Sequence, residues 1–370
     1  LHLMVIPIIG LGLPEDSLAY LDKGVRVSKA VGDHSSMTRF YSNIGVFYMN
    51  RGDYEAGTTY TRRAFETAER IKDVDAMAQS GPDLCQDFMN AGRFRETIQV
   101  ATRIIDAIEN TSREADYFGG MTNIYSILNT FIGYSMGMQG DFTNGLISCE
   151  KALACAIRYA GPETIGVCEV QLGSLHLLRG SHERAFKLIG DGCRHLEEAN
   201  FYWHLPLGRS MFGLAETFLG NPQSGLVHIE KALAENQKIG VEWRRSLLLF
   251  NLGVCRFTLA DYQPAMQAMN QAHVLSVESG QRYVAGKALT WLGRIHLRLD
   301  PQSFEAASGL ICQGIEILGE LNIQPELALG HLFLGELYTR SGKRDLSAEH
   351  LGRARQMFKD LGMHVKRSNG

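Results

Sequence analysis

The sequence predicts an all-α protein: a right-handed superhelix, or α-solenoid, of about nine helix-turn-helix units in a single domain over residues 1–370. Three observations predict this fold. A short pattern recurs about every 40 residues, and the apolar side chains within each recurrence follow a helical period. Glycine is frequent, at 39 of 370 residues, whereas proline is rare, at 9. Many glycines and few prolines favour short helices that pack closely and end in tight turns.

A small residue is the most regular feature of the recurring pattern. These anchor residues are Gly45, Cys85, Gly133, Gly173, Gly213, Gly253, Gly293 and Gly335, and their spacings are 40, 48, 40, 40, 40, 40 and 42 residues. Self-similarity at a nearly constant period of this size indicates a repeat architecture. An incomplete ninth unit precedes them, because Gly12 and residues 20–24 align with Gly52 and residues 60–64.

Each unit is predicted to be a helix, a tight turn and a second helix. In residues 241–259 the apolar side chains Leu248, Leu249, Leu252, Cys255 and Leu259 follow the stripe of one buried helix face. Residues 262–277 repeat that stripe after a short polar break. Aspartates before the second helices are expected to be N-caps, and glycines after them left-handed C-caps: Asp53, Asp141 and Asp261, and Gly240 and Gly280. The small anchor residue would let the two helices of a unit approach closely.

One unit cannot bury its apolar face alone, so stability must come from stacking of neighbouring units. We therefore expect one continuous array in which each unit contacts only its sequence neighbours. The eight extra residues between the anchors at 85 and 133 should lie near residues 110–120. They are expected to lengthen a helix or to form a loop that adds a local feature to the inner groove.

Two of the quoted units carry a resemblance to a known family. Residues 44–48 read Ile-Gly-Val-Phe-Tyr and residues 334–338 read Leu-Gly-Glu-Leu-Tyr. The second helices carry alanines at regular places: Ala64, Ala152, Ala232, Ala272 and Ala354. This pattern resembles the tetratricopeptide-repeat family over essentially the whole chain. The period departs from that family, at 40 residues rather than about 34, and no regular proline separates the units.

Long-period arrays of this kind look like the sensor arms of large bacterial signal-transduction ATPases, including the maltose-responsive transcription activator and cyclase-linked ATPases. Residues 348–363 are similar to the ends of such arms. Because the chain begins with leucine, we expect a fragment or a processed product of a longer protein. The apolar residues 1–13 are too short to span a bilayer and lack the basic start of a signal peptide.

Composition excludes several classes of function. Lysine and arginine number 37 and acidic residues 40, so the net charge is −3, which argues against nucleic-acid and membrane-surface binding. The seven cysteines include no CxxC pair, which favours reduced thiols and a cytoplasmic location. The sequence contains no P-loop, HExxH or GxSxG motif. We therefore predict that the protein is not an enzyme and holds no metal or cofactor. Trp203, Trp243 and Trp291 are predicted to be core residues.

The resemblance places a concave groove on the first helix of each unit. Reading the family's groove positions in this sequence gives the candidate binding residues Arg39, Asn50, Gln86, Asn90, Tyr134, Phe218, Phe250, Asn251, Phe257, Lys287, Arg294 and Arg298. The groove would be rich in amides at one end, aromatic in the middle and basic at the other end. Amides can hold a ligand backbone, aromatic rings provide contact area, and arginine pairs with carboxylates. Alternatively, Phe218, Phe250 and Phe257 are core, and Arg294 and Arg298 belong to a solvated face.

Two functions follow from this groove. The first is a non-enzymatic scaffold that binds a peptide or partner protein, with an acidic group at the basic end. The second is a ligand-sensing arm of a larger signalling ATPase, cyclase or transcription regulator, whose ligand would be a small molecule. A deep pocket near units four to seven would favour a small ligand, and an open trough would favour a peptide.

Overall fold

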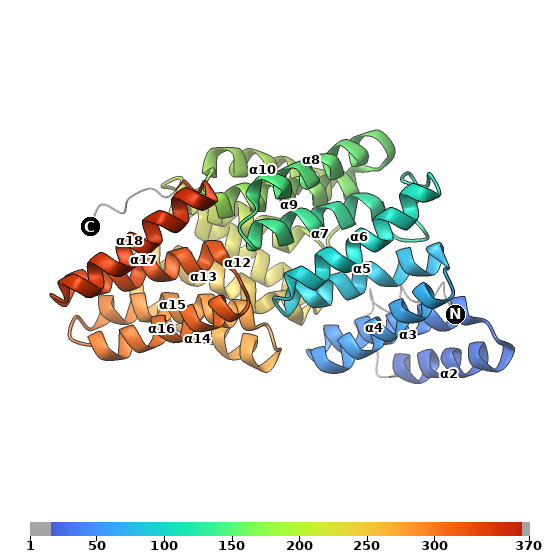
Figure 1. The fold of residues 1–370 in the computed structure, drawn as a ribbon, viewed down its shortest axis with the longest axis horizontal. Coiled ribbons are helices and arrows are strands. Elements are labelled where there is room, and N and C mark those ends of the chain that lie inside the picture. The colour runs from blue at the N-terminus through green and yellow to red at the C-terminus, as the bar shows by residue number, and fades with distance from the viewer. Residues whose placement is uncertain (1–15, 365–370) are drawn as a thin grey trace.

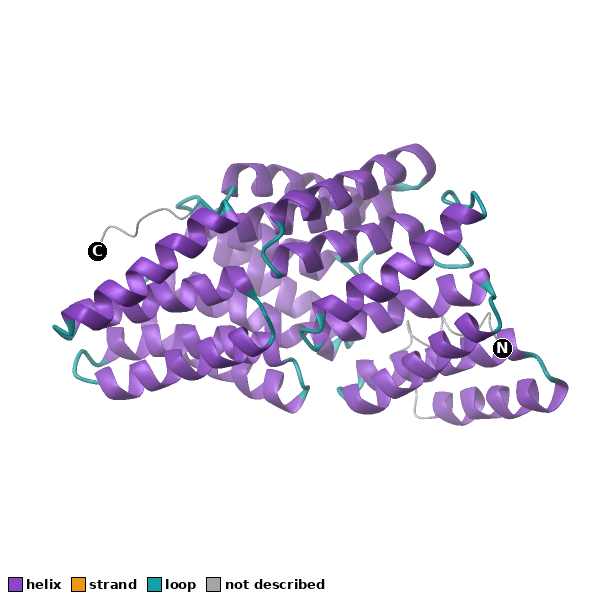
Figure 2. Cartoon of the chain, in the orientation of Figure 1, coloured by secondary structure: helices purple, strands orange, loops and turns teal. Residues whose placement is uncertain are grey.

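The computed structural model describes residues 16–364, and within these residues it contains seventeen α-helices, one short 3-10 helix and no strand (Figure 2). The first nine helices are α2 (Asp16–Val31), α3 (His34–Asn50), α4 (Tyr54–Arg70), α5 (Val74–Asn90), α6 (Phe94–Asn110), α7 (Ile124–Met138), α8 (Phe142–Tyr159), α9 (Pro162–Arg179) and α10 (His182–Glu198). The others are α11 (Leu205–Phe218), α12 (Pro222–Ile239), η2 (Glu242–Arg244), α13 (Arg245–Thr258), α14 (Tyr262–Glu278), α15 (Arg282–Leu299), α16 (Phe304–Glu320), α17 (Gln324–Arg340) and α18 (Arg344–Leu361).

The helices form consecutive antiparallel pairs, which confirms the predicted units. Every anchor residue lies in the first helix of a pair, from Gly45 in α3 to Gly335 in α17. Helix α2 packs against α3 and supplies the second helix of the incomplete unit. Gly12 of that unit lies outside the described residues. The pairs stack in chain order into a superhelix (Figure 1).

Close approach of the paired helices explains the anchor glycines. A Cβ atom added to Gly133 would lie 2.4 Å from Cys149 Sγ and 2.5 Å from the carbonyl oxygen of Gly145. At Gly213 the carbonyl oxygen of Gly225 would lie 2.5 Å away. A side chain at either position would overlap the partner helix, so the predicted seam between paired helices is confirmed.

Most of the predicted helix caps are also confirmed. The Asp53 carboxylate accepts a hydrogen bond of 3.0 Å from the backbone N–H of Ala56, and Asp141 accepts one of 3.1 Å from Asn144. Gly240 and Gly280 both have a φ of +67°, in the left-handed region. The prediction for Asp261 is wrong, because its side chain does not cap α14. Instead, Asp261 pairs with Arg256 of the preceding helix at 3.4 Å.

The expectation that units contact only their sequence neighbours is wrong, because the superhelix is wound tightly enough for successive turns to touch. The Gln281 side-chain amide donates a 3.1 Å hydrogen bond to the Tyr54 hydroxyl, 227 residues away in sequence. Arg179 Nε donates to the carbonyl oxygen of Gly362, 183 residues away, at 3.1 Å. Separations of this size correspond to about five units of 40 residues, so about five units make one turn.

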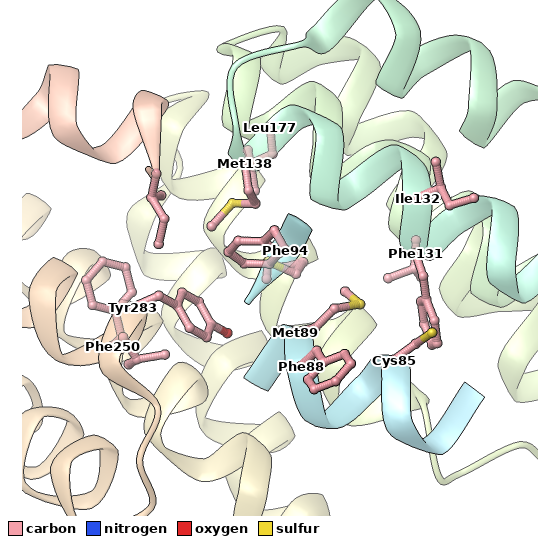
Figure 3. Packing of buried hydrophobic residues seen from close by; sticks show 14 of the residues in the cluster. Cys85, Phe88, Met89, Phe94, Phe131, Ile132, Met138, Leu177, Phe250 and Tyr283 are labelled. Carbon is pink, nitrogen blue, oxygen red and sulfur yellow. The ribbon is translucent and has the colours of Figure 1, made fainter. Parts of the chain in front are cut away.

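Contact between turns fills much of the inside of the superhelix. The Phe94 ring packs edge-on against Tyr283 of the next turn, with ring centroids 5.9 Å apart (Figure 3). One continuous cluster of buried apolar side chains runs from Phe65 in α4 to Leu337 in α17. A smaller, separate cluster joins α2, α3 and α4. The inner wall is therefore packed over most of its length, and open space remains where the small cluster faces the large one.

Candidate functional site

A pocket of about 440 Å³ lies between the N-terminal helices and the middle of the superhelix. Its walls come from α3, α5, the loop before α7, the start of α7, the loop before α11 and η2. The polar and aromatic side chains in these walls include Arg39, Ser42, Asn50, Gln79, Asp83, Gln86, Asp87, Phe118, Trp203, His204 and Trp243. We call this space the amide pocket. Its size is that of a small molecule or of a short piece of a peptide.

The extra residues predicted near 110–120 form a loop at this pocket, which confirms that expectation. The loop is held in place by Arg113, which pairs with Asp75 at 2.9 Å and with Asp116 at 2.6 Å. The guanidinium of Arg113 also lies 4.5 Å from the centre of the Phe118 ring. These contacts fix Phe118 at a φ of +50° and place the ring in the pocket wall. The Arg113 guanidinium lowers the pKa of Asp75, so the Asp75 carboxylate in this ion pair is charged near neutral pH.

Two tryptophans from distant segments form the opposite wall. Trp203 precedes α11 and Trp243 lies in η2, and both are half-buried. The Arg244 side chain is fully buried between them, 5.3 Å and 4.4 Å from their ring centroids, and donates a hydrogen bond to the Trp203 carbonyl oxygen. The prediction that Trp203 and Trp243 are core is therefore wrong, whereas Trp291 is buried as predicted.

Polar atoms without partners gather in the amide pocket. Asn50 is only 6% exposed, and its amide nitrogen donates to the Val46 carbonyl oxygen at 2.8 Å. That bond fixes the amide so that its buried oxygen has no hydrogen-bond partner. Gln79 Oε1 and Arg39 Nε are also buried and have no partner among the described residues. Buried polar groups are nearly always hydrogen-bonded, so atoms left without a protein partner mark places that water or a ligand can occupy.

Two carboxylates on α5 complete the pocket. The Ser42 hydroxyl donates to Asp83 and the Thr61 hydroxyl to Asp87, each at 2.5 Å. Burial raises the pKa of Asp83 to about 6 and raises that of Asp87 well above its usual value. The Asp83 charge further raises the pKa of Asp87, which lies one helical turn away. Within residues 16–364 neither carboxylate forms an ion pair.

The structure brings together only the amide-rich part of the predicted groove. Arg39, Asn50 and Gln86 line the amide pocket. Asn90 lies beside it and accepts a 3.1 Å hydrogen bond from Gln86, while its own Nδ2 has no partner among the described residues. These four candidate residues therefore lie on two adjacent units.

The predicted aromatic stretch packs within the array. Phe250 is buried and Tyr134 packs edge-on against Phe94, with centroids 6.3 Å apart. Asn251 is buried and donates to the Ser210 hydroxyl at 3.0 Å. Phe257 lies against Trp291 at 5.5 Å, and Phe218 stacks on His182 at 5.1 Å. These side chains lie away from the amide pocket and make their contacts inside the protein.

The predicted basic end is largely neutralised by carboxylates of the same chain. Lys287 pairs with Glu326 at 2.8 Å, and both side chains are almost fully buried. Arg294 pairs with Glu336 at 3.5 Å and lies 4.4 Å from the centre of the Phe333 ring. Arg298, one turn further along α15, forms no ion pair with the described residues. Of the three predicted basic residues, Arg298 is therefore the one that has no carboxylate partner among the described residues.

We predict that Arg294→Glu destabilises the protein, although the sequence pattern alone would allow the change on a solvated face. The substitution places a carboxylate beside Glu336 and removes a guanidinium that covers three aromatic rings: Phe257, Trp291 and Phe333. A cost of about 3 kcal/mol is expected, read as a lower midpoint in urea denaturation. Arg298→Glu is the matched control and should change the midpoint little. Equal midpoints for the two variants would contradict the described packing of Arg294.

Some pocket residues were not predicted from the sequence. Asp83 and Asp87 lie two residues before and after the anchor Cys85, outside the groove positions of the family pattern. A signal for them exists: two aspartates four residues apart lie on one side of the same helix, next to the anchor. Trp203, Trp243 and Phe118 come from connecting segments, where a repeat pattern carries no information.

Across residues 16–364 no group of three or more histidine, cysteine or acidic side chains could hold a metal ion. None of the helices described here is long and apolar enough to cross a membrane. The seven cysteines are all unbridged.

No protein-family model matches the sequence, and no curated protein matches it. Solved structures do resemble the fold. A Rap protein complexed with Competence and Sporulation Factor is 12% identical, with a TM-score of 0.55 over 88% of this chain and 98% of that one. The fold is a tetratricopeptide-type superhelix.

Two further solved structures resemble the tetratricopeptide-type superhelix at lower TM-scores. Aspartyl phosphate phosphatase F from Bacillus subtilis is 12% identical, with a TM-score of 0.48 over 90% of this chain and 97% of that one. A signal transduction ATPase with a tetratricopeptide-repeat sensor from Pyrococcus horikoshii is 10% identical, also at 0.48. That match covers 94% of this chain and 53% of the ATPase, so this chain spans about half of its length.

Proposed function

We propose that this protein binds a peptide, or a short segment of a partner protein, in the amide pocket, and that it acts by binding rather than by catalysis. The observation that carries this proposal is the set of buried polar atoms without partners on Arg39, Asn50 and Gln79. They include both a donor and acceptors, which is what a peptide backbone requires.

The walls of the amide pocket support the same function. Phe118, Trp203 and Trp243 provide aromatic area for an apolar side chain, next to the amides that would hold the backbone. The fold is that of the Rap protein, and that protein was solved with Competence and Sporulation Factor bound. A ligand of this chain would lie between units that belong to the two apolar clusters, and binding there would change how they pack.

A second candidate function is ligand sensing within a larger signalling ATPase, cyclase or transcription regulator. The observation that favours it is the pocket volume of about 440 Å³, which suits a small molecule better than a long extended peptide. An ATPase domain joined to this chain in the full-length gene would support the sensing function. Tight binding of a small molecule that excludes peptides would also support it.

Tryptophan fluorescence tests the proposed function directly, because Trp203 and Trp243 line the pocket and Trp291 does not. Titration with pools of short peptides that lack aromatic residues should change the emission. Asn50→Ala should weaken the tightest pool about tenfold, because the ligand loses one hydrogen bond to a buried amide.

Asn251→Ala is the matched control for that titration, since Asn251 is an equally buried amide whose nitrogen already bonds Ser210 inside the array. It should leave the affinity unchanged. Peptides that quench Trp291 alone would place binding outside the amide pocket. Preferential binding of acidic peptides, lost on Arg298→Glu, would instead support the basic end as the site.

A further inference from the structure

Buried hydrogen-bond acceptors lie in the amide pocket beside one unpartnered donor, Arg39 Nε. Asn50 Oδ1 and Gln79 Oε1 are buried without partners, and the Asp83 carboxylate receives a hydrogen bond from Ser42 alone among the side chains described. A buried carboxylate is stable only beside a cation or several donors. These three groups would all be satisfied by one ligand group that carries several N–H donors and a positive charge.

Among the described residues, no cation forms an ion pair with Asp83. The titratable or charged side chains that line the pocket are Arg39 from α3, Asp83 and Asp87 from α5, and His204 from the loop before α11. The charge of Arg39 helps Arg113 to lower the pKa of Asp75, and it does not offset the burial of Asp83. Burial lowers the pKa of His204 to about 3, so His204 is neutral near pH 7.

We propose that the amide pocket is selective for a cationic nitrogen of its peptide ligand, with Asp83 as the counterion and Asn50 and Gln79 as acceptors. This inference rests on the proposed function and names the chemistry of the ligand. The cation is an ammonium or guanidinium group, supplied either by a lysine or arginine side chain or by a free peptide amino terminus. Apolar residues next to the cation would contact the wall formed by Phe118, Trp203 and Trp243.

The Asn50 side chain is the independent observation that separates this site from a simple acidic cluster. Its amide is nine-tenths buried and lines the pocket, and its orientation is fixed by the Val46 carbonyl oxygen. The oxygen that remains can only accept a hydrogen bond. A ligand carboxylate at this place would therefore meet acceptors on both Asn50 and Asp83, which disfavours acidic ligands here.

The experiment uses five pools of pentapeptides without aromatic residues, titrated into the whole chain and followed by tryptophan fluorescence. Four pools are capped at both ends and carry lysine, arginine, leucine or glutamate at the central position. The fifth has central leucine and a free amino terminus. We expect at least one cationic pool to bind at least tenfold more tightly than the capped leucine pool at pH 7.5. Tighter binding of the lysine or arginine pool would show that the pocket takes a side-chain cation. Tighter binding of the fifth pool would show that it takes a free amino terminus.

Two variants test whether Asp83 is the counterion responsible for the preference for cationic peptides. Asp83→Asn should reduce the preference of the cationic pool over the capped leucine pool to about onefold, chiefly by weakening binding of the cationic pool. Asp106→Asn, which removes one exposed carboxylate from α6, should leave the preference intact. The melting temperature of Asp83→Asn at pH 7.5 should equal or exceed that of the unchanged protein. The substitution removes a buried charge, and the oxygen of the new asparagine can still accept the hydrogen bond from Ser42.

The preference should also depend on pH. Burial raises the pKa of Asp83 to about 6, so the carboxylate is charged above pH 6 and gains a proton below it. The preference for cations should therefore fall as the pH is lowered from 7.5 to 5. Burial holds the pKa of His204 at about 3, so His204 stays neutral across this range and does not reverse the sign.

The possible results are distinct. A cationic preference that survives Asp83→Asn would overturn the inference, as would tightest binding by the glutamate pool. Equal affinity for all pools would overturn the inference and leave the proposed function standing. If no pool bound the unchanged protein, the proposed function would fail and the inference with it.

Discussion

Replacing Gly133 with alanine is expected to lower the free energy of unfolding by about 2 kcal/mol. The new methyl group would overlap Cys149 Sγ and the Gly145 carbonyl oxygen, and the latter belongs to a backbone that cannot move without shifting α8. Overpacking of this kind costs up to about 3 kcal/mol, and alanine returns about 1 kcal/mol of helix propensity. Urea denaturation followed by helical circular dichroism measures the change.

Alanine substitutions at two other glycines, Gly309 and Gly253, serve as controls for this prediction. A Cβ atom on Gly309 in α16 would meet nothing within 4 Å, so Gly309→Ala should leave the midpoint unchanged or raise it. At Gly253 the nearest atom is the terminal methyl of Met269, at 2.7 Å, and the side chain of Met269 is flexible. Gly253→Ala should therefore fall between the other two. If Gly133→Ala were as stable as Gly309→Ala, close packing at the seam would not be the reason for the anchor glycines.

The helix pairs could be predicted from the sequence because their causes are local. The apolar stripe, the capping aspartates and the anchor glycines all act within one unit of about 40 residues. The N-cap at Asp53 followed from residue type alone. Asp261 did not, because the nearby Arg256 competes for the same carboxylate.

The winding of the superhelix could not be predicted in the same way. It depends on a small rotation between neighbouring units, which many side chains set together, and that rotation decides whether distant units touch. In the sequence, Phe94 and Tyr283 are therefore ordinary apolar residues of two separate units, and nothing indicates that they are in contact. Phe250 and Lys287 are interior because they pack between neighbouring units, where Lys287 contacts the Phe250 ring and pairs with Glu326.

The part of the candidate site that lies on neighbouring units could be predicted, and the part that depends on winding could not. Arg39, Asn50 and Gln86 sit on consecutive first helices, so the repeat pattern placed them on one face. Trp203 and Trp243 reach that face only because the superhelix returns there after several units. Asp83 was not predicted as a site residue because the groove positions of the family pattern exclude it. Asn251, which was predicted, lies at the equivalent place, two residues before its own anchor.

Phe94→Ala is the second substitution with a large expected effect. The ring is 2% exposed and packs both on Tyr134 of the next unit and on Tyr283 of the next turn. Truncation of a buried phenylalanine costs about 3 to 5 kcal/mol, because the cavity left behind relaxes only partly. We expect a cost in that range, measured as a lower urea midpoint. Phe257→Ala, which removes a half-buried ring, should cost clearly less.

Contact between successive turns of the superhelix is the central feature of the fold, because it buries part of the inner wall. A double-mutant cycle with Phe94→Leu and Tyr283→Leu measures it, and leucine keeps enough apolar volume for the variants to fold. The parallel cycle of Phe94→Leu with Tyr134→Leu provides the positive control within neighbouring units. We predict a coupling of about 1 kcal/mol between Phe94 and Tyr283, typical of an edge-on aromatic pair. Additivity of the two substitutions within about 0.3 kcal/mol would mean that residues 94 and 283 do not touch, and would contradict the tightly wound superhelix.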